Sequence, residues 1–348
     1  MKVARILVIK QTSLGDVLHS TGHMRCIRQQ FPDAHITLLT ANTSVDIYRD
    51  NPNVDRIVEF QRYEIKKRWL RNPLWSIGHF AETFRQVGSA PYDLAIDLQG
   101  RWKSALFLYR ANSKRKFIKG NWPFLTGFRD RSLHALKEMD GVLELAGINS
   151  QDNHMDFYCS AQASDSMQAG LANAGLGMGK YIVLSPFTRW PSKNWSLDHY
   201  AELISRLPKD LPVVVSGAGE DHTTTKQFLA EHSFQDVINF CGQLSLQEFA
   251  ELVRNARVVV SGDSFAMHVA AACNTSVVAL FGPTDEVKVG PTGSNVVLLR
   301  GNKECAKCYQ HLCAKRCIDS IATQSVCDAV LQIRASSSSS FGKIKPAT

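Results

Sequence analysis

The chain has 348 residues, of which 44% are hydrophobic, and its formal net charge at pH 7 is +8. One core rarely serves more than about 200 residues, so this length predicts two domains. The apolar run at residues 6–9 is too short for a signal-peptide core, and no apolar stretch approaches the roughly 20 residues that span a bilayer. The sequence therefore argues against a secretion signal or a membrane span, and we expect a cytoplasmic protein.

Positive charge is concentrated in two stretches of the first half. Residues 101–131 contain nine Lys or Arg and a single acid, Asp130. A smaller basic group consists of Arg62, Lys66, Lys67, Arg68 and Arg71. Such a concentration indicates either a solvated face or an anionic partner, which is nucleic acid, an acidic membrane surface, or a phosphorylated or carboxylated substrate. No aromatic RNA-binding signature or zinc-finger spacing accompanies the charge, so we expect no nucleic-acid partner.

Short runs that are apolar throughout recur along the chain, each followed by a segment with helical periodicity. This pattern is typical of parallel strands covered by helices on both faces, and it predicts α/β architecture in both halves. The predicted strands cover residues 6–10, 35–39, 56–60, 93–98, 181–185, 212–216, 237–240, 258–261 and 277–281. We further expect a hinge and an opening helix over residues 160–180, a terminal helix over 322–334, and a disordered serine-rich tail from Ser336.

The turn after the first predicted strand ends in a carboxylate, Asp16. Doubly wound domains bind ligands at the carboxyl ends of their strands, with the space between the domains as the expected site. Residues 11–16 lack the G-x-G-x-x-G pattern of dinucleotide-binding proteins. Gly15 allows this turn to approach a ligand closely, and Asp16 precedes a helix predicted over residues 17–30. Asp16 is therefore either the helix N-cap or a functional group.

The segment after the fourth predicted strand is suited to an anion. Gly100, Arg101 and Lys103 stand at the start of a helix, where the helix dipole and the two cations favour a carboxylate or a phosphate.

The loop at residues 185–196 opens the second half with Thr188, Arg189 and Lys193. A hydroxyl and an ammonium group suit a diphosphate, whose oxygens gain charge when a bond to it breaks. The two tryptophans of this loop are expected to pack rather than to stack on a cofactor.

Further polar residues follow two later strands of the second half. Glu220 is suited either to accept hydrogen bonds from the two ribose hydroxyls of a nucleotide, or to stabilise the first turn of a helix through the helix dipole. Asp263 and Ser264 precede a small-residue helix that can lie close to the sheet, so that its free amides reach a diphosphate. His268 belongs either to this site or to the core.

The nine cysteines fall into two groups. Four are isolated in apolar segments and are expected to be inert core residues: Cys26, Cys159, Cys241 and Cys273. The other five are crowded into one stretch: Cys305, Cys308, Cys313, Cys317 and Cys327. The first four of these have C-x2-C-x4-C-x3-C spacing. One hypothesis is a structural zinc or iron held by these four thiolates, because cytoplasmic proteins rarely carry structural disulfides. The other is free or redox-sensitive thiols, and a catalytic metal is not expected.

Four stretches, in order, resemble motifs of the lipopolysaccharide heptosyltransferases of glycosyltransferase family 9. They are TSLGDVLHS, DLAIDLQGRWKSAL, TRWPSKNW and the signature GDSFAMHVAAACNTSVVALFGPTD. The likeness runs over nearly the whole chain, and the first motif is closer to type I enzymes, which add the first heptose to Kdo of the inner core. Phe265 and Ala266 stand where the signature usually has Gly-Pro, which predicts a reshaped loop over the donor.

The resemblance implies a GT-B fold of two Rossmann-like, doubly wound domains that face a central cleft. It implies an acceptor-binding domain over residues 1–160, an ADP-heptose-binding domain over 161–335 and a tail over 336–348. The implied reaction is an inverting, metal-independent transfer of heptose from ADP-L-glycero-D-manno-heptose, with no cofactor required. Asp16 matches the catalytic base. The residues that match donor contacts are Thr188, Lys193, Glu220, Asp263, Ser264 and His268.

Under this resemblance the acceptor is Kdo-lipid A or a related core acceptor, met at the anionic cytoplasmic face of the inner membrane. Its carboxylates and phosphates are expected to contact Ser13, Gly15, Arg62, Lys66, Arg101 and Lys103. One alternative is a family 9 glycosyltransferase that acts on a later core heptose or on a protein. The other is a non-catalytic binding or redox module built around the cysteine segment.

Overall fold

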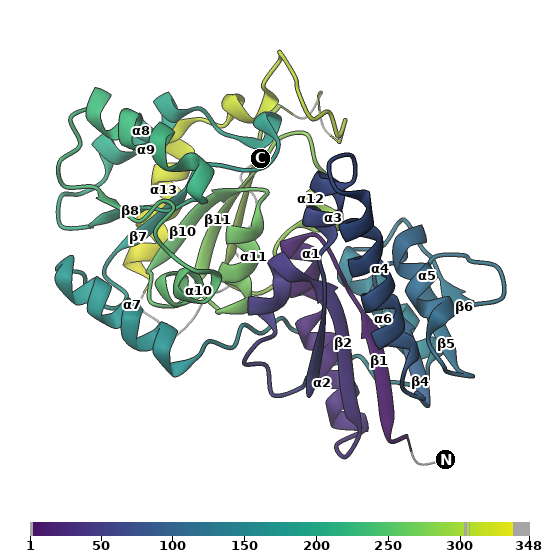
Figure 1. Ribbon diagram of the computed structural model, residues 1–348. Coiled ribbons are helices and arrows are strands. Elements are labelled where there is room, and N and C mark those ends of the chain that lie inside the picture. The colour runs from purple at the N-terminus through teal and green to yellow at the C-terminus, as the bar shows by residue number, and fades with distance from the viewer. Residues whose placement is uncertain (1–2, 303–304, 306, 337–348) are drawn as a thin grey trace. The chain divides into compact units, whose positions relative to one another are not determined.

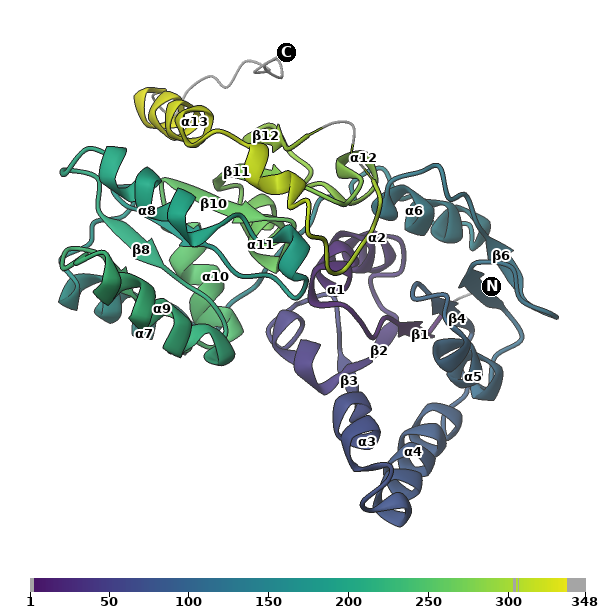
Figure 2. The same ribbon diagram turned by 90° about the horizontal axis from the view of Figure 1, so that it is seen from above.

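The computed structural model describes residues 3–302, 305 and 307–336. The chain divides into two units, Met1–Tyr158 and Cys159–Thr348. Each unit contains one sheet of six parallel strands with helices on both faces (Figure 1; Figure 2). Parallel strands that are covered on both sides must be apolar throughout, which explains the uninterrupted apolar runs of the sequence.

In the first unit, the strand order is β3-β2-β1-β4-β5-β6. The strands are β1 Arg5–Ile9, β2 His35–Ala41, β3 Arg56–Phe60, β4 Leu94–Asp97, β5 Lys116–Lys119 and β6 Thr126–Phe128. The helices are α1 Leu14–His19, α2 Thr21–Gln30, η1 Asn42–Ile47, α3 Arg62–Arg68, α4 Pro73–Gly88, α5 Trp102–Arg110 and α6 Ala135–Leu145. Because β1 pairs with β2 on one side and with β4 on the other, the switch point of this sheet lies between β1 and β4.

The second unit repeats this topology, with the order β12-β11-β10-β7-β8-β9. Its strands are β7 Ile182–Ser185, β8 Val213–Val215, β9 Ile238–Asn239, β10 Val258–Gly262, β11 Ser276–Phe281 and β12 Val296–Arg300. Its helices are α7 Ala161–Asn173, η2 Pro191–Lys193, α8 Leu197–Arg206, η3 Gly219–Asp221, α9 His222–Glu231, α10 Leu246–Arg254, α11 Phe265–Ala272, α12 Glu286–Val289, η5 Cys317–Ser320 and α13 Thr323–Ala335. Here the switch point lies between β7 and β10.

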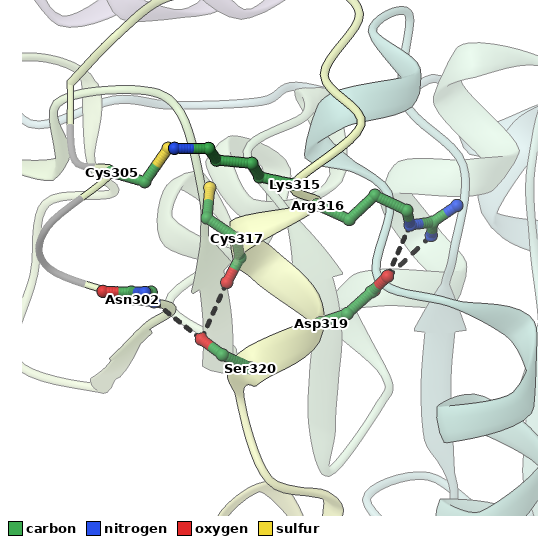
Figure 3. A pocket seen from close by; sticks show the side chains of 7 residues that line it. All are labelled: Asn302, Cys305, Lys315, Arg316, Cys317, Asp319 and Ser320. Carbon is green, nitrogen blue, oxygen red and sulfur yellow. Dashed lines mark hydrogen bonds and ion pairs between the residues drawn. The ribbon is translucent and has the colours of Figure 1, made fainter.

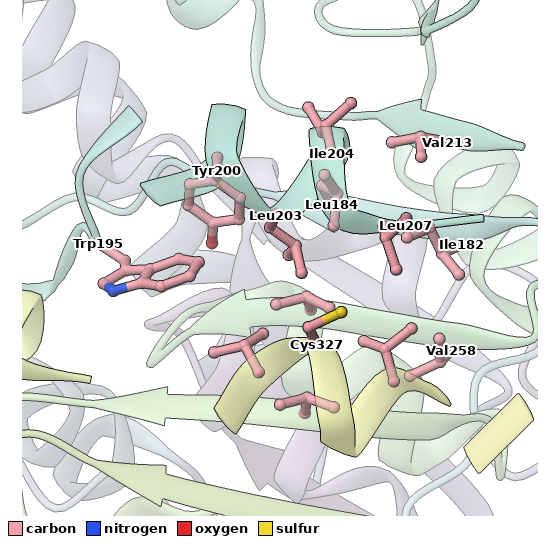
Figure 4. Close-up of a cluster of buried hydrophobic side chains, with 14 of the residues drawn as sticks. Ile182, Leu184, Trp195, Tyr200, Leu203, Ile204, Leu207, Val213, Val258 and Cys327 are labelled. Atoms are coloured by element: carbon pink, nitrogen blue, oxygen red, sulfur yellow. The ribbon is translucent and has the colours of Figure 1, made fainter. Parts of the chain in front are cut away.

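The largest core cluster of the second unit shows how the strands use both of their faces. Alternate residues of β10, Val258 and Val260, belong to one buried cluster with side chains of α8 and α13 such as Leu203 and Val330. All four side chains are fully buried. Figure 4 shows part of this cluster, with Val258 of β10, Leu203 of α8 and Cys327 of α13 labelled. Burying a side chain of this size contributes about 1.5–3 kcal/mol, so this layer holds the carboxyl end of β10 in place.

Two details of the predicted elements are wrong. The helix expected over residues 17–30 begins earlier, at Leu14, and is interrupted at Ser20. The Ser20 hydroxyl donates to the carbonyl oxygen of Val17 at 2.7 Å, a local bond that competes with the helical ladder. The strands β5, β6 and β12 were not predicted. β6 is the edge strand of the sheet and β5 is its neighbour, and both are short and only partly buried.

The tail predicted to be disordered lies outside the described residues, except for Ser336 at the end of α13. Among the described residues, no helix combines the length and the apolar content that a bilayer span requires.

Candidate active site

The side chain of Gln99 joins the carboxyl ends of β1 and β4. Its Oε1 atom accepts hydrogen bonds from the backbone N–H groups of Gln11 and Thr12, at 3.1 and 2.9 Å. Gly100 makes this arrangement possible, because its φ is +67° and a Cβ there would stand 2.2 Å from the carbonyl oxygen of Lys119. The turns after β1, β4 and β5 are therefore packed together at the switch point.

Asp16 lies in the first turn of α1, and Ser13, not Asp16, is the N-cap. The carboxylate oxygen Oδ2 of Asp16 accepts hydrogen bonds from the backbone N–H and from the hydroxyl of Ser13, both at 3.0 Å. Burial opposes ionisation of Asp16, but the charge of Lys10 and the hydrogen bonds from Ser13 outweigh it and lower the pKa of the carboxyl group. Asp16 is consequently ionised at neutral pH.

Lys10, which directly follows β1, supplies the positive charge that acts on Asp16. Its Nζ atom donates to the carbonyl oxygen of Leu98 at 3.3 Å. Burial lowers the pKa of Lys10 to about 8, and the charge of Asp16 partly offsets that effect. Sequence reasoning missed Lys10 as a site residue, although a cation at the end of an apolar run was a visible signal. A second cation, Lys119 at the end of β5, also acts on the Asp16 carboxylate and pairs with Glu138 at 2.7 Å.

Asp97, the last residue of β4, is a second carboxylate at the switch point that sequence reasoning missed. It is fully buried, and its Oδ1 atom accepts hydrogen bonds from the N–H groups of Gln99 and Gly100 at 2.7 and 3.1 Å. Burial raises the pKa of Asp97 to about 6, against the lowering effect of these hydrogen bonds. Asp97 therefore shapes the turn that holds Gln99.

We expect the pH dependence of folding stability to report on Asp97. A carboxyl group with a raised folded-state pKa contributes most stability below its unfolded pKa, near 4, and loses this contribution as the pH rises through about 6. The variant Asp97→Asn keeps the accepting oxygen and removes the buried charge. It should be more stable than the wild type at pH 7, by roughly 2–3 kcal/mol, and gain nothing at pH 4. Chemical unfolding at both pH values measures this difference, with the exposed Asp33→Asn as control; an equal effect at both pH values would contradict it.

The residues predicted to bind the acceptor are partly brought together. Ser13 and Gly15 lie in the Asp16 turn, and the guanidinium group of Arg62, at the start of α3, donates to the hydroxyl of Thr12 in the same turn. Arg101 is the N-cap of α5, directly after the β4 turn. The other two lie farther along these helices, Lys66 exposed on α3 and Lys103 with its Nζ atom 5.2 Å from the ring centre of Trp102.

In the second unit, Lys193 and Asp263 meet at the switch point. The Nζ atom of Lys193 lies 2.7 Å from Oδ2 of Asp263, and both side chains are largely buried. Lys193 ends η2, which follows β7, whereas Asp263 follows β10. The ring of Trp190 lies beside the same ammonium group, with its centre 4.4 Å from Nζ. Asp263 and Trp190 thus hold the lysine in one position.

The loop that carries Lys193 is held by hydrogen bonds within the loop and by close contact with β10. The backbone N–H of Thr188 donates to the Asn194 side chain at 2.8 Å, and the Thr188 hydroxyl donates to the carbonyl oxygen of Trp190 at 2.9 Å. A Cβ atom at Gly262 would stand 2.6 Å from the carbonyl oxygen of Lys193, so only glycine lets β10 approach the loop so closely. The second tryptophan, Trp195, is buried and donates to the carbonyl oxygen of Ile321 at 3.2 Å, as expected for a packing residue.

The remaining predicted donor residues also follow strands of this sheet. Ser264 is the N-cap of α11, and its hydroxyl oxygen accepts from the N–H of Ala266 at 3.2 Å. His268 is buried one turn farther along α11. Glu220 is exposed in η3, after β8. Five of the predicted donor residues thus follow the carboxyl ends of the neighbouring strands β7, β8 and β10. They are Thr188, Lys193, Glu220, Asp263 and Ser264.

The clustered cysteines gather around Cys317. Burial raises the pKa of the Cys317 thiol, and the neighbouring thiol groups of Cys305, Cys308 and Cys313 raise it further. Cys305 and Cys317 line a pocket together with Lys315 and Arg316 (Figure 3). In the described part of the chain, however, no three His, Cys, Asp or Glu side chains stand in an arrangement that can hold a metal ion. The four thiols are neighbours without forming a coordination shell.

The isolated cysteines are less uniform than expected. Cys26 and Cys241 are buried, whereas Cys159 and Cys273 are only partly so. Burial raises the pKa of the thiol in all four, to about 12 for Cys159 and about 11 for Cys273. Such thiols stay protonated at neutral pH and are poor nucleophiles.

Two doubly wound domains, each with charged side chains at its switch point, form the architecture of the Rossmann-like class, whose members bind ligands at the strand ends. The family model "Glycosyltransferase family 9 (heptosyltransferase)" matches residues 80–319. The chain belongs to this family and is a transferase enzyme.

Similar proteins of known function cover most of the chain. Lipopolysaccharide heptosyltransferase 3 of Escherichia coli is 24% identical over 81% of this chain and 85% of its own length. Lipopolysaccharide heptosyltransferase 1 of Escherichia coli K12 is 25% identical over 86% of this chain and 94% of its own length. The solved structure of the E. coli heptosyltransferase WaaC with ADP is 21% identical, with a TM-score of 0.76 over 94% of this chain and 99% of that one. The predicted α/β class with two doubly wound GT-B domains is thereby confirmed.

Proposed function

We propose that this enzyme transfers L-glycero-D-manno-heptose from ADP-L-glycero-D-manno-heptose to Kdo of the lipopolysaccharide inner core, with inversion at the anomeric carbon. Family membership and the names of the two relatives support heptose transfer in lipopolysaccharide synthesis. The related fold solved with ADP supports an ADP-linked donor. The observation that carries the proposal is the ionised Asp16 at the switch point of the first sheet.

Asp16 is proposed as the general base. In an inverting transfer, the acceptor hydroxyl attacks the anomeric carbon while the bond from that carbon to the diphosphate breaks. The hydroxyl proton passes to the Asp16 carboxylate, and the electron pair of the breaking bond leaves with ADP. A carboxylate with a lowered pKa is a weak base, so proton transfer accompanies attack rather than preceding it.

Lys193 and the first amides of α11 are proposed to stabilise the departing ADP. The diphosphate gains negative charge as the bond breaks, and preorganised positive groups lower the barrier at that moment. The ion pair with Asp263 holds the ammonium group of Lys193 in place. Asp263 itself is proposed to accept hydrogen bonds from sugar hydroxyls, since a carboxylate and a phosphate repel. Thr188, Ser264 and His268 complete the diphosphate and sugar contacts, and Glu220 contacts the nucleoside.

The acceptor assignment has one specific competitor, a later heptose of the core, because the relatives named as heptosyltransferases 1 and 3 are almost equally similar to this chain. Incubation with ADP-heptose and either Kdo-lipid A, heptosyl-Kdo-lipid A or an acceptor protein discriminates between them by mass spectrometry. We expect a gain of one heptose on Kdo-lipid A. Transfer to only one of the other acceptors would replace Kdo in the proposal, and no transfer to any of them would refute it. Membership of a transferase family decides against the non-catalytic alternative.

The clustered cysteines are assigned no step in the reaction, and a structural zinc or iron there stays a prediction. If it is correct, the purified chain contains about one metal ion per molecule, and X-ray absorption shows four sulfur ligands. Chelation should then lower the unfolding temperature, and Cys308→Ser should lose the metal while the distant Cys159→Ser keeps it. Metal-free protein with four titratable thiols in this segment would contradict the prediction.

A further inference from the structure

The turn between α3 and α4 and the first turns of α4 expose four large apolar side chains. Trp69 is 52% exposed, Leu70 92%, Leu74 81% and Ile77 52%. We call residues 66–78 the α3–α4 tip. Leu74 and Ile77 stand at i and i+3 on one face of α4, and a Cβ atom at Gly78 would meet nothing within 4 Å. The tip therefore exposes four large apolar side chains within the stretch 69–77, and Leu70 and Leu74 are almost uncovered by the described residues.

The α3–α4 tip is an ordered structure rather than a loose loop. Asn72 caps α4 by accepting from the N–H of Trp75 at 3.1 Å, and α3 packs against α4 (Figure 2). The guanidinium group of Arg68 lies 4.7 Å from the ring centre of Trp75, and that ring stacks on His79. Between the two helices, the buried Ser76 donates to the carbonyl oxygen of Ile65 at 3.4 Å, whereas Trp69, Leu70 and Leu74 remain exposed.

Positive charge borders this apolar face. The basic residues of the tip are Lys66, Lys67, Arg68 and Arg71. The nearest acid along the chain, Glu64, is paired with Arg68 at 2.9 Å, which leaves Lys66, Lys67 and Arg71 exposed to solvent. The centre of a protein interface is usually depleted in lysine, whereas an apolar face that contains tryptophan and is bordered by Lys and Arg fits the headgroup region of an anionic bilayer.

We propose that the α3–α4 tip is a membrane-docking element that inserts Trp69, Leu70 and Leu74 into the interface of an anionic bilayer. Lys66, Lys67 and Arg71 then lie at the level of the lipid phosphates. Interfacial apolar side chains reach about 5–10 Å into the headgroup and acyl boundary, which suits side chains at the end of a short helix.

The position of α3 connects this element with the acceptor turn, a step that rests on the proposed function. Arg62 begins α3 at the turn of Asp16, and the tip follows at the other end of the helix. Seven helical residues span about 10 Å. A tip inserted in the interface therefore holds the Asp16 turn near the headgroup level, where the sugar of a lipid-linked acceptor lies.

Vesicle co-sedimentation of the full chain tests the docking, and it needs neither donor nor acceptor. We expect binding to vesicles of phosphatidylcholine mixed with phosphatidylglycerol, little binding to phosphatidylcholine alone, and weaker binding at high salt. The variant Trp69→Ser/Leu70→Ser/Leu74→Ser should bind at least about tenfold more weakly. Lys67→Gln/Arg71→Gln should lose roughly 30-fold, because each cation near an anionic surface contributes about a fivefold change in affinity. The matched control removes two exposed apolar side chains elsewhere, Met178→Ser/Val287→Ser, and should bind like the wild type.

Three outcomes would overturn the proposal. They are absence of wild-type binding to the anionic vesicles, equal binding to both kinds of vesicle, and unchanged binding by the triple variant. Conversion of a dimer into a monomer by the triple variant, without vesicle binding by the wild type, would assign the face to a second copy of the chain instead. A heptosyl transfer assay with a delipidated acceptor in solution separates this proposal from the proposed function. The triple variant should keep its rate there and lose it only with acceptor embedded in vesicles.

Discussion

Replacement of Asp16 by asparagine is expected to lower the rate of heptosyl transfer by roughly 10²–10⁴-fold, the usual contribution of a positioned general base. Asparagine retains an oxygen that can accept the N–H of Ser13, so the start of α1 should persist. The loss should therefore appear in kcat with little change in donor affinity. Initial rates with Kdo-lipid A and ADP-heptose, together with donor binding by calorimetry, measure the two quantities separately.

A matched control for Asp16→Asn exists in the second unit. Glu248 occupies the same position in the first turn of α10, where its carboxylate accepts the N–H of Ser245 at 2.9 Å. The variant Glu248→Gln removes a helix-capping charge of the same kind, with an expected stability cost of about 1 kcal/mol or less, and should transfer heptose at the wild-type rate. Equal rates for Asp16→Asn and the wild type would remove Asp16 as the base. Equal losses in both variants would point to folding instead.

The second large effect is expected at Lys193. The variant Lys193→Gln should lower kcat by about 10²–10³-fold, because it removes positive charge from the place where the leaving diphosphate gains negative charge. KM for the donor should rise less than kcat falls, since the interaction strengthens in the transition state. Steady-state kinetics over a range of ADP-heptose concentrations gives both parameters, and Lys209→Gln, an exposed lysine of the same unit, is the control.

Lys193→Gln also leaves the Asp263 carboxylate buried without its ion-pair partner, which can destabilise the unit. The double variant Lys193→Gln/Asp263→Asn removes both charges. It should recover the unfolding temperature of the wild type but not its activity. Recovery of both would mean that the lysine only balances the charge of Asp263, and would exclude a contact with the diphosphate.

The apolar runs were sufficient to predict nine of the strands and the α/β class. β5 and β6 were missed because they have only four and three residues and are mostly partly buried, so they lack the long apolar run of a fully covered strand. Asp16 was visible from its place after the first apolar run, but its position in the helix was not. Ser13, three residues earlier, has the extended backbone of an N-cap residue, and its carbonyl oxygen accepts the first hydrogen bond of the helix. Asp16 therefore lies in the first turn of α1.

The sequence by itself determined that two parallel sheets form and that polar residues follow their strands, because burial on both faces requires apolar runs and leaves polar groups to the strand ends. Only the tertiary structure decided which of these residues meet. Lys10 and Asp16 follow β1, whereas Asp97 and Lys119 end β4 and β5. These four residues interact because β1 pairs with β4, and β4 with β5. Strand order depends on long-range packing that no local sequence pattern encodes. This order places the positive charges of Lys10 and Lys119 near Asp16, where they keep its carboxyl group ionised.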